Sequence, residues 1–381
     1  MLVLEALRAK FGDALLLHFG TRAKPLLAVI DGGPPGVWAD ALEPRLQEIR
    51  VQRRLADGKA LEIELAMVSH IDRDHIAGML EMAQGMKELR DARQPLPWKI
   101  KRFWHNSFDD LLGNDDVTVG ASASGMSAAS LGGLLRPEGS LILASVSEGR
   151  DLRNLLDALK LEGNPPFEGL VRAGQKPVVL DNLELKVVAP SEKNLLALQK
   201  DWDRHVREIL EKEDEESRAE AAAFVDRSVY NLSSIVILAE ADGKRILLTG
   251  DGRGDHTLEG LEAAGLMDAE GRIEVDVLKM PHHGSERNVD ATYFDRIRAK
   301  HYVISADGKF DNPDVKTLAM ISAARPDDRF TIHLTYPPEK FNEPAIGRKV
   351  ARFFKKEQAA GREYKVMTRK PDELSVSIKL S

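Results

Sequence analysis

The chain has 381 residues, a length that suits one large enzyme domain with insertions. Its 30% charged and 43% hydrophobic residues are ordinary for a globular protein, and its net charge of -7 argues against a general nucleic-acid coat. It has no cysteine, which excludes disulfides and thiolate zinc sites, so any metal must be held by His, Asp and Glu. The N-terminal segment shows neither a signal peptide nor a membrane span, so we expect a cytoplasmic protein without a membrane partner.

The first 105 residues alternate short apolar runs with turns. Strands are expected at Leu2–Leu7, Ala14–Phe19, Leu26–Ile30, Leu61–Val68 and Lys99–Trp104. Helices are expected at Ala39–Leu55 and over residues 76–92. The run Leu61–Val68 is apolar almost throughout, which is typical of a buried strand in a layered α/β protein.

Residues 107–225 differ in texture from the rest of the chain. They include the small-residue run GASASGMSAASLGG and a charged helical stretch over 191–225. We expect a largely helical, partly flexible insertion within one domain spanning 1–381. The charged stretch is interpreted as a solvated lid or as a surface for self-association or a protein partner.

Regular βα spacing resumes at Ser233. Strands are expected at Ser234–Ala239, Arg245–Thr249, Val275–Met280, Tyr302–Ser305 and Phe330–Leu334, the first two as a hairpin. The tail, 339–381, carries an excess of basic residues and is expected to form a helix at Ile346–Gln358 and strands at Tyr364–Thr368 and Leu374–Leu380. Its charge indicates either a solvated helix face or an edge that contacts phosphate or a partner.

Four potential metal ligands follow the strand at Leu61–Val68. His70, Asp72, Asp74 and His75 fall within six residues, and a turn lets such side chains converge. Two imidazoles and two carboxylates suit zinc or manganese. Two acids this close without a cation would suppress each other's ionisation. The alternative, a helix N-terminus capped by one aspartate, explains neither histidine.

Two later strands also end in potential ligands. Arg245–Thr249 runs into Gly250-Asp251-Gly252, and Val275–Met280 runs into Pro281-His282-His283-Gly284-Ser285. Taken alone, Asp251 could be a turn residue and the histidines surface residues. Three strand ends carrying His and Asp are nevertheless how α/β folds assemble a site.

Together these segments resemble the metallo-β-lactamase superfamily, an αββα sandwich with a metal site at one edge. Residues 70–75 match its HxHxDH motif, with Asp72 in place of the second histidine. The DGG turn at Asp31 resembles the first motif, whose aspartate supports the site without binding metal. Asp251 matches the bridging aspartate, and the PHHGS segment matches the final histidine motif.

Within the superfamily, the chain resembles the hydrolase domain of the bacterial DNA-uptake (competence) channel protein and phosphorylcholine esterases. The shared features are the early GD turn, Asn231–Val236, LLTGD and Asp276–Ser285, and the resemblance covers roughly residues 1–105 and 226–335. One departure lies near Asp307, where the segment DGKFDNP has Asn312 at the position of the relatives' histidine.

The resemblance implies two divalent ions, Zn²⁺ or Mn²⁺. The first would be held by His70, Asp72 and His105, the last chosen because it ends a strand. Asp74, His75 and one histidine of the pair would hold the second, with Asp251 bridging. Of that pair His283 is favoured as the ligand, although His282 is nearly as good a candidate.

The remaining expected roles concern the reaction. A metal-bridging hydroxide would attack the substrate. The leaving oxygen would be protonated by the unligated histidine of the pair, which is His282 if His283 is the ligand, or by Asp72 if Asp72 is not a ligand. Ser285 is expected to contact the substrate. A phosphodiester, with a nucleic acid or nucleotide first among candidates, is favoured by the resemblance and the basic tail. The alternatives are a hydrolase of lactones, thioesters or lactams, and a partner-binding module with a vestigial metal site.

Overall fold

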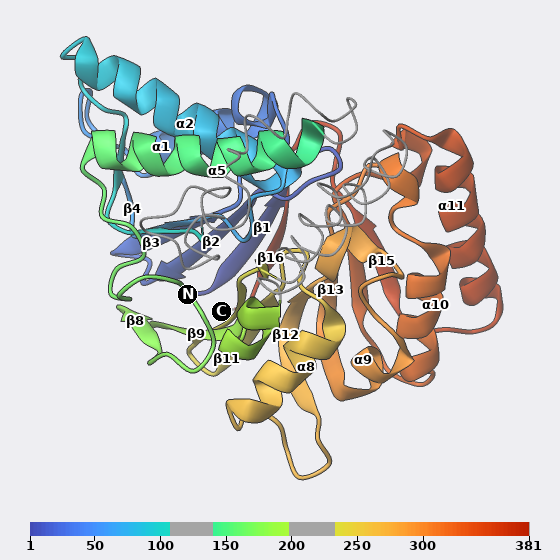
Figure 1. Cartoon of the computed structure of the whole chain (residues 1–381). Helices are drawn as coiled ribbons and strands as arrows, with labels where there is room; N and C mark the ends of the chain where they lie inside the picture. Colours follow the sequence, from blue (N-terminus) through green and yellow to red (C-terminus); the bar gives the residue numbers. More distant parts are fainter. Residues whose placement is uncertain (107–139, 198–232, 381) are drawn as a thin grey trace, which may run out of the picture.

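Two β-sheets packed face to face, with helices on both outer faces, form the described part of the molecule (Figure 1). The computed structural model describes residues 1–106, 140–197 and 233–380. The first sheet has the order β16-β1-β2-β3-β5-β7. Its strands are β1 (Val3–Leu7), β2 (Leu15–Gly20), β3 (Pro25–Ile30), β5 (Leu65–Met67), β7 (Phe103–Trp104) and β16 (Ser375–Lys379).

The second sheet has the order β15-β14-β13-β12-β11-β10-β9-β8. Its strands are β8 (Val178–Leu180), β9 (Leu183–Ala189), β10 (Val236–Ala241), β11 (Lys244–Leu248), β12 (Ile273–Lys279), β13 (Ile297–Ile304), β14 (Thr331–Leu334) and β15 (Lys365–Thr368). The strands β11 to β15 run parallel, and β10 and β11 form the expected hairpin. The apolar residues between the sheets, such as Leu17, Met67 and Val303, are fully buried.

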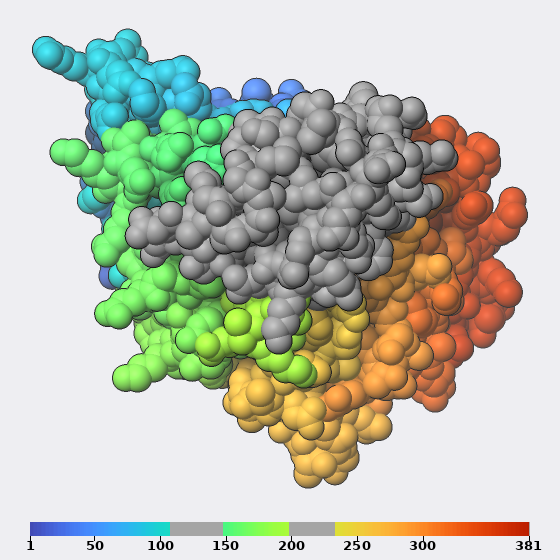
Figure 2. Space-filling model, viewed as in Figure 1, coloured from blue at the N-terminus to red at the C-terminus, as the bar shows by residue number. Residues whose placement is uncertain are grey.

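Each outer face is covered by its own helices. The first sheet carries α1 (Glu43–Gln52), α2 (Arg73–Asp91) and α5 (Ser140–Leu159), and the second carries α8 (Gly254–Ala263), α9 (Ala291–Arg296), α10 (Val315–Ala324) and α11 (Pro344–Ala359). In the space-filling view the N-terminal half, blue to green, and the C-terminal half, yellow to red, occupy opposite sides (Figure 2). This is the expected αββα sandwich. No helix among the described residues is long and apolar enough to cross a membrane.

The prediction of a single strand at Leu61–Val68 is wrong. The run divides into β4 (Leu61–Ile63), which pairs with β6 (Trp98–Ile100), and β5, which pairs with β3 and β7. At the break, the Glu64 amide donates to the carbonyl of Leu27 in β3 (2.8 Å), so the chain passes there from β6 to β3 as its partner. A continuous apolar run therefore contains two short strands that pair with different neighbouring strands.

The boundary expected for the insertion, 107–225, is also wrong over its described part. Strands β8 and β9 lie within it, yet they extend the second sheet beside β10. Alternate residues of both strands, among them Val178, Leu183 and Leu185, are buried between the sheets, which is the period-two pattern of a half-buried strand. The small-residue run and residues 198–225 lie outside the described residues, so a partner contact there stays a prediction.

The basic tail is built into the fold. The expected helix is α11, and the two expected strands are β15 and β16, each at the edge of a different sheet. Strand β16 pairs antiparallel with β1, from Val3 opposite Lys379 to Leu7 opposite Ser375. The two ends of the chain therefore lie side by side (Figure 1).

Helix α2 touches the turn after β3 through glycines. A Cβ atom at Gly78 would lie 2.0 Å from the Gly32 carbonyl oxygen, and the Gly32 amide donates to the His75 carbonyl (2.8 Å). Similarly, a Cβ at Gly12 would lie 2.0 Å from the Asp74 carbonyl oxygen. The DGG and FGD turns thus press directly on the start of α2, where the metal-ligand motif lies.

Gly78→Ala should therefore destabilise the protein by about 1–3 kcal/mol, because the helix must move away from the turn. Gly85→Ala in the same helix is the matched control. Its added Cβ meets nothing within 4 Å and should stabilise the helix by about 0.5–1 kcal/mol. Urea unfolding of the two variants measures the difference, and equal stabilities would contradict this packing.

Candidate metal centre

The HxDxDH segment follows β5 and runs into the first turn of α2, at the carboxyl end of the first sheet's strands. Helix α2 begins at Arg73, so Asp72 is its N-cap residue, but the Asp72 side chain makes no capping hydrogen bond. The capping interpretation therefore fails for Asp72. His70 and His75 are both buried, with 2% and 0% of their surfaces exposed.

Asp251 lies opposite, in the turn after β11. Its amide donates to Ser234 Oγ (3.1 Å), and its side chain is 3% exposed. The turn passes close to the first motif because Gly250 is left-handed (φ 48°), and a Cβ there would lie 2.8 Å from Ser69 Oγ. A third turn, after β12, carries His282 and His283, both in the left-handed region (φ 47° and 56°).

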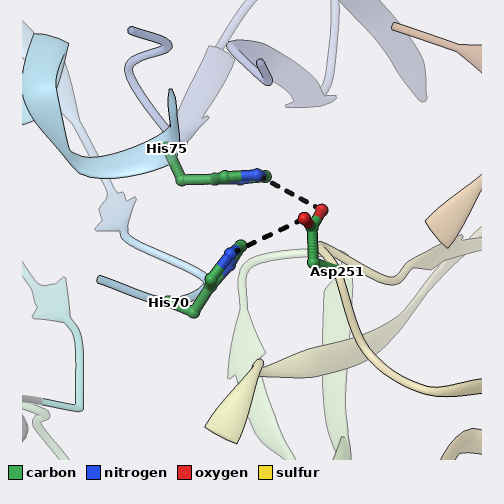
Figure 3. A group of neighbouring side chains, drawn as sticks. All are labelled: His70, His75 and Asp251. Atoms are coloured by element: carbon green, nitrogen blue, oxygen red, sulfur yellow. Dashed lines mark ion pairs between the residues drawn. The ribbon is translucent and has the colours of Figure 1, made fainter. Parts of the chain in front are cut away.

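The two oxygens of Asp251 face different histidines. Oδ1 lies 3.2 Å from His75 Nε2 and 3.6 Å from His283 Nε2. Oδ2 lies 3.8 Å from His70 Nε2 and 3.6 Å from His282 Nε2. Figure 3 shows His70 and His75 approaching the two ends of this carboxylate.

The other two aspartates of the motif add one carboxylate to each side. Asp74 Oδ2 lies 3.3 Å from His283 Nε2 and 3.9 Å from His75 Nε2. Asp72 Oδ2 lies 3.5 Å from His70 Nε2. The cluster therefore has an Oδ1 side with two histidines and Asp74, and an Oδ2 side with two histidines and Asp72.

The rings of His75 and His70 are oriented by Asp31 and Ser69. His75 Nδ1 lies 2.9 Å from Asp31 Oδ2, a carboxylate oxygen that can only accept, so Nδ1 carries the proton. The single hydroxyl proton of Ser69 is donated to the same oxygen (2.7 Å), so Ser69 Oγ accepts from His70 Nδ1 (3.1 Å). In the neutral form, both rings thus direct an Nε2 lone pair at Asp251.

The adjacent histidines are oriented in the same sense. His283 Nδ1 donates to the Ser305 carbonyl (2.9 Å). His282 Nδ1 lies 2.6 Å from Asn288 Oδ1, and Asn288 Nδ2 donates to the Asp251 carbonyl (2.8 Å), which assigns the amide oxygen as the acceptor toward His282. His282 and His283 therefore also present Nε2 lone pairs to the cluster.

Lone pairs on nitrogen thus face lone pairs on oxygen, an arrangement that needs cations between them. The buried Nε2 atoms of His70, His75 and His283, and Asp251 Oδ1, have no hydrogen-bond partner. Four groups of ligand atoms within 4.8 Å of one another involve these residues among those described. They are His70 with His75 and Asp251, Asp74 with His75 and His283, Asp13 with Asp251 and His283, and Asp13 with Asp31 and His75. These donors fit divalent ions.

Electrostatics without ions lead to the same requirement. Burial opposes a charge on His75, but the carboxylates of Asp251, Asp74 and Asp31 outweigh it and hold the pKa of His75 well above its usual value. Burial likewise opposes a charged His283, yet Asp251 and Asp13 raise its pKa. Burial raises the pKa of Asp251, but the surrounding histidines, His282 first, hold it well below the usual range. These shifts all favour positive charge beside Asp251, which is the charge that divalent ions would supply.

A buried ion pair lies directly behind the two histidines of the Oδ1 side. Asp13, from the FGD turn, and Lys279, the last residue of β12, are both fully buried and contact each other through Oδ2 and Nζ. Asp13 Oδ1 lies 3.6 Å from His283 Nδ1, and Asp13 Oδ2 lies 3.9 Å from His75 Nδ1. Both residues lie in segments that carry the resemblance, the early GD turn and Asp276–Ser285, but neither was predicted to be a site residue.

Two of the expected site residues lie differently from the rest. His105 follows β7, its ring packs edge-on against Phe103 (5.9 Å between centroids), and it belongs to none of the metal-competent groups among the described residues. Ser285 is 5% exposed, and its amide donates to the His282 carbonyl (2.8 Å). The ligand role of His105 and the substrate contact of Ser285 stay predictions.

Lys279→Met should destabilise the protein by about 3–5 kcal/mol, because it leaves Asp13 charged and unpaired in the interior. Adding Asp13→Asn to that variant should restore much of the loss, so the double-mutant cycle is strongly non-additive. Lys24→Met is the control, since it breaks an exposed pair with Asp181 (2.9 Å) and should cost less than about 1 kcal/mol. Additive effects at 13 and 279 in chemical unfolding would contradict the pairing.

Comparisons with known proteins give the following similarities. No family model matches the chain. ComE operon protein 3 of Bacillus subtilis (strain 168) is 30% identical over 118 residues, which are 29% of this chain and 14% of that much longer protein. Similar solved structures include a protein described as a metal-dependent hydrolase from Parabacteroides distasonis ATCC 8503, with 9% identity and a TM-score of 0.35, covering 86% of this chain and 90% of that one.

Two further structures are similar at the same level. Zn²⁺-bound PqqB from Methylobacterium extorquens has 12% identity and a TM-score of 0.37, covering 96% of this chain and 87% of that one. CmlA, a diiron β-hydroxylase from Streptomyces venezuelae, has 10% identity and a TM-score of 0.36, covering 100% and 54%. The chain's own two-sheet sandwich, with HxDxDH, Asp251 and the PHHGS histidines meeting at one edge, is the αββα arrangement that the resemblance to the metallo-β-lactamase superfamily implies.

Proposed function

We propose that this protein is a metal-dependent hydrolase that holds two divalent ions and cleaves phosphodiesters. The observation that carries the proposal is the carboxylate of Asp251, whose two oxygens each face a different pair of histidine Nε2 atoms. The Oδ1-side ion would be held by Asp74, His75 and His283. His70 and His282 would hold the Oδ2-side ion, with Asp251 shared, and Asp72 beside them would stay unbound and available for proton transfer.

This assignment gives both histidines of the pair a ligand role. A third histidine on the Oδ2 side was expected at His105, whereas His282 Nε2 already lies 3.6 Å from Asp251 Oδ2. Asn288 keeps the proton of neutral His282 on Nδ1, so Nε2 is free to bind an ion. Zn²⁺ and Mn²⁺ both accept such mixed imidazole and carboxylate sets.

Divalent ions in such a site supply Lewis acidity and a water acidic enough to react at neutral pH. The chain's own residues supply orientation and a proton. Asp31, Ser69, Asn288 and the Ser305 carbonyl fix the four rings before any substrate arrives. Asp72, whose side chain is 28% exposed, is the group we assign to protonate the leaving oxygen, since burial raises its pKa although His70 opposes the change.

The choice of phosphorus over carbon is supported by the resemblance to the hydrolase domain of the DNA-uptake channel protein and by the basic tail. Helix α11 carries Lys349, Arg352, Lys355 and Lys356 on its exposed side. A nucleic acid or nucleotide is the substrate we favour. A lactone, thioester or lactam is the alternative that the following measurements separate from it.

The purified protein should contain about two zinc or manganese ions per chain and hydrolyse a phosphodiester faster than a phosphomonoester or a lactone. Asp74→Ala should lose at least one ion and lower hydrolysis more than about a hundredfold, since even an outer-shell partner contributes ten- to a hundredfold. Asp91→Ala, at an exposed position near the end of α2, should behave like the parent protein. Metal analysis with parallel rate measurements checks this. Cleavage of the lactone alone would overturn the phosphodiesterase proposal.

A second comparison tests the ligand set. His282→Ala should release the Oδ2-side ion and leave about one ion per chain, whereas His105→Ala should keep two. Both variants must first show native circular dichroism, because His105 is buried. The reverse outcome, loss at 105 and retention at 282, would restore His105 as the ligand and leave His282 as the proton donor.

A further inference from the structure

An exposed aromatic ring lies in a turn that packs against the PHHGS segment, where a Cβ at Gly284 would lie 3.0 Å from Pro313. Phe310, in the turn that follows β13, has 66% of its surface exposed, which is unusual for so large an apolar side chain. Its ring packs edge-on against Phe11, with 5.4 Å between the centroids. The turn is the segment DGKFDNP, in which Asn312 stands where the relatives have histidine.

Several contacts place this pair of rings beside the ion ligands. Phe11 precedes Gly12, which lies against the Asp74 carbonyl, and the Asp13 amide donates to that same carbonyl (3.2 Å). The Gly12 carbonyl accepts from Ser305 Oγ (2.6 Å), and the Ser305 carbonyl orients His283. Phe11 is therefore two residues along the chain from the Asp13 that contacts His75 and His283.

The turn itself is held firmly. Asp307 is 2% exposed, accepts from the Lys309 amide through Oδ1 (3.1 Å) and is contacted by the Asn342 side chain. Phe310 and Asp311 both have left-handed backbones (φ 57° and 65°), which non-glycine residues adopt rarely and mostly where the surroundings impose it. An apolar ring is thus held out in solvent by a fixed backbone.

A cation completes the arrangement. Lys309 Nζ lies 3.8 Å from the centroid of Phe11 and 4.8 Å from that of Phe310. Among the described residues no carboxylate lies within ion-pair distance of it, although the charge of Asp307 acts on it from farther away. A flat ring next to a cation that forms no direct ion pair among the described residues is a combination that binds single-stranded nucleic acid, because a base stacks on the ring and the phosphate pairs with the charge.

Other ligands of this superfamily fit the arrangement less well. A choline group is a cation and needs the face of an aromatic ring, but Lys309 already occupies the face of Phe11 and would repel it. A lactone or lactam needs an enclosed apolar pocket, whereas Phe310 is exposed. A nucleobase followed by a phosphate uses both the ring and the charge.

We infer that Phe310, Lys309 and Phe11 form a binding site for one unpaired nucleobase and its phosphate, which places the neighbouring phosphodiester of a single-stranded nucleic acid at the metal centre. The inference rests on the proposed function for the cleavage step only. Base binding itself needs no ion and can be measured separately.

The test is fluorescence anisotropy of a labelled oligothymidylate with the full chain in EDTA. Phe310→Ala should weaken binding about five- to a hundredfold, the value of one base stacked on an aromatic ring. An oligomer with abasic positions should bind the parent protein about as weakly as the normal oligomer binds Phe310→Ala. Lys309→Gln should weaken binding and make it less dependent on salt.

Two controls match these changes. Val51→Ala removes another exposed apolar side chain, and Lys99→Gln removes an exposed charge outside the basic tail, and neither should alter binding. Equal affinities for Phe310→Ala and Val51→Ala, or for the normal and abasic oligomers, would overturn the inference. A parent protein that cleaves a base-free diester but binds no oligomer would overturn it and leave the proposed function standing. Oligomer binding that depends on Phe310, without any diester cleavage, would do the opposite.

Discussion

The structure depends on one electrostatic conflict, the meeting of four imidazole lone pairs with the carboxylate of Asp251. In each ring the Nδ1–H group donates a hydrogen bond. Its acceptor is either a group that can only accept, such as Asp31 Oδ2 or the Ser305 carbonyl, or a group whose other hydrogen bond fixes it as an acceptor. The rings cannot relieve the conflict by turning without losing those bonds. A cation between the nitrogen and oxygen atoms removes this conflict. The hydrogen bonds therefore orient the four rings for cation binding in advance.

The scaffold around this cluster is organised to hold it still. Glycines at 12, 32 and 78 let two turns and helix α2 approach to distances that no side chain would permit. Behind the Oδ1-side histidines, the buried pair of Asp13 and Lys279 joins the first turn of one sheet to the last residue of a strand in the other. Burying such a pair gives little stability in itself, and its position indicates that it fixes the relative placement of the two sheets at the site.

Much of this was predictable, because period-two patterns and strand-end motifs are local signals. The sandwich, the hairpin at Asp242-Gly243 and the convergence of His70, Asp74 and Asp251 were all anticipated from the sequence. The division of residues 61–68 was not, since Glu64 changes its partner to a residue 37 positions earlier. Strands β8 and β9 were missed because charged helical sequence follows them closely, and period-two runs so short are easily assigned to a loop.

The adjacent histidines show where local reasoning ends. Two consecutive residues in a strand or helix direct their side chains apart. The sequence therefore predicts that one histidine of the pair binds an ion and the other does not. Two consecutive left-handed residues change that geometry and bring both Nε2 atoms to opposite oxygens of one carboxylate. Left-handed backbone recurs at Phe310 and Asp311, in the next turn along the same edge. His282 and His283 are thus placed by backbone conformations that side-chain patterns do not encode.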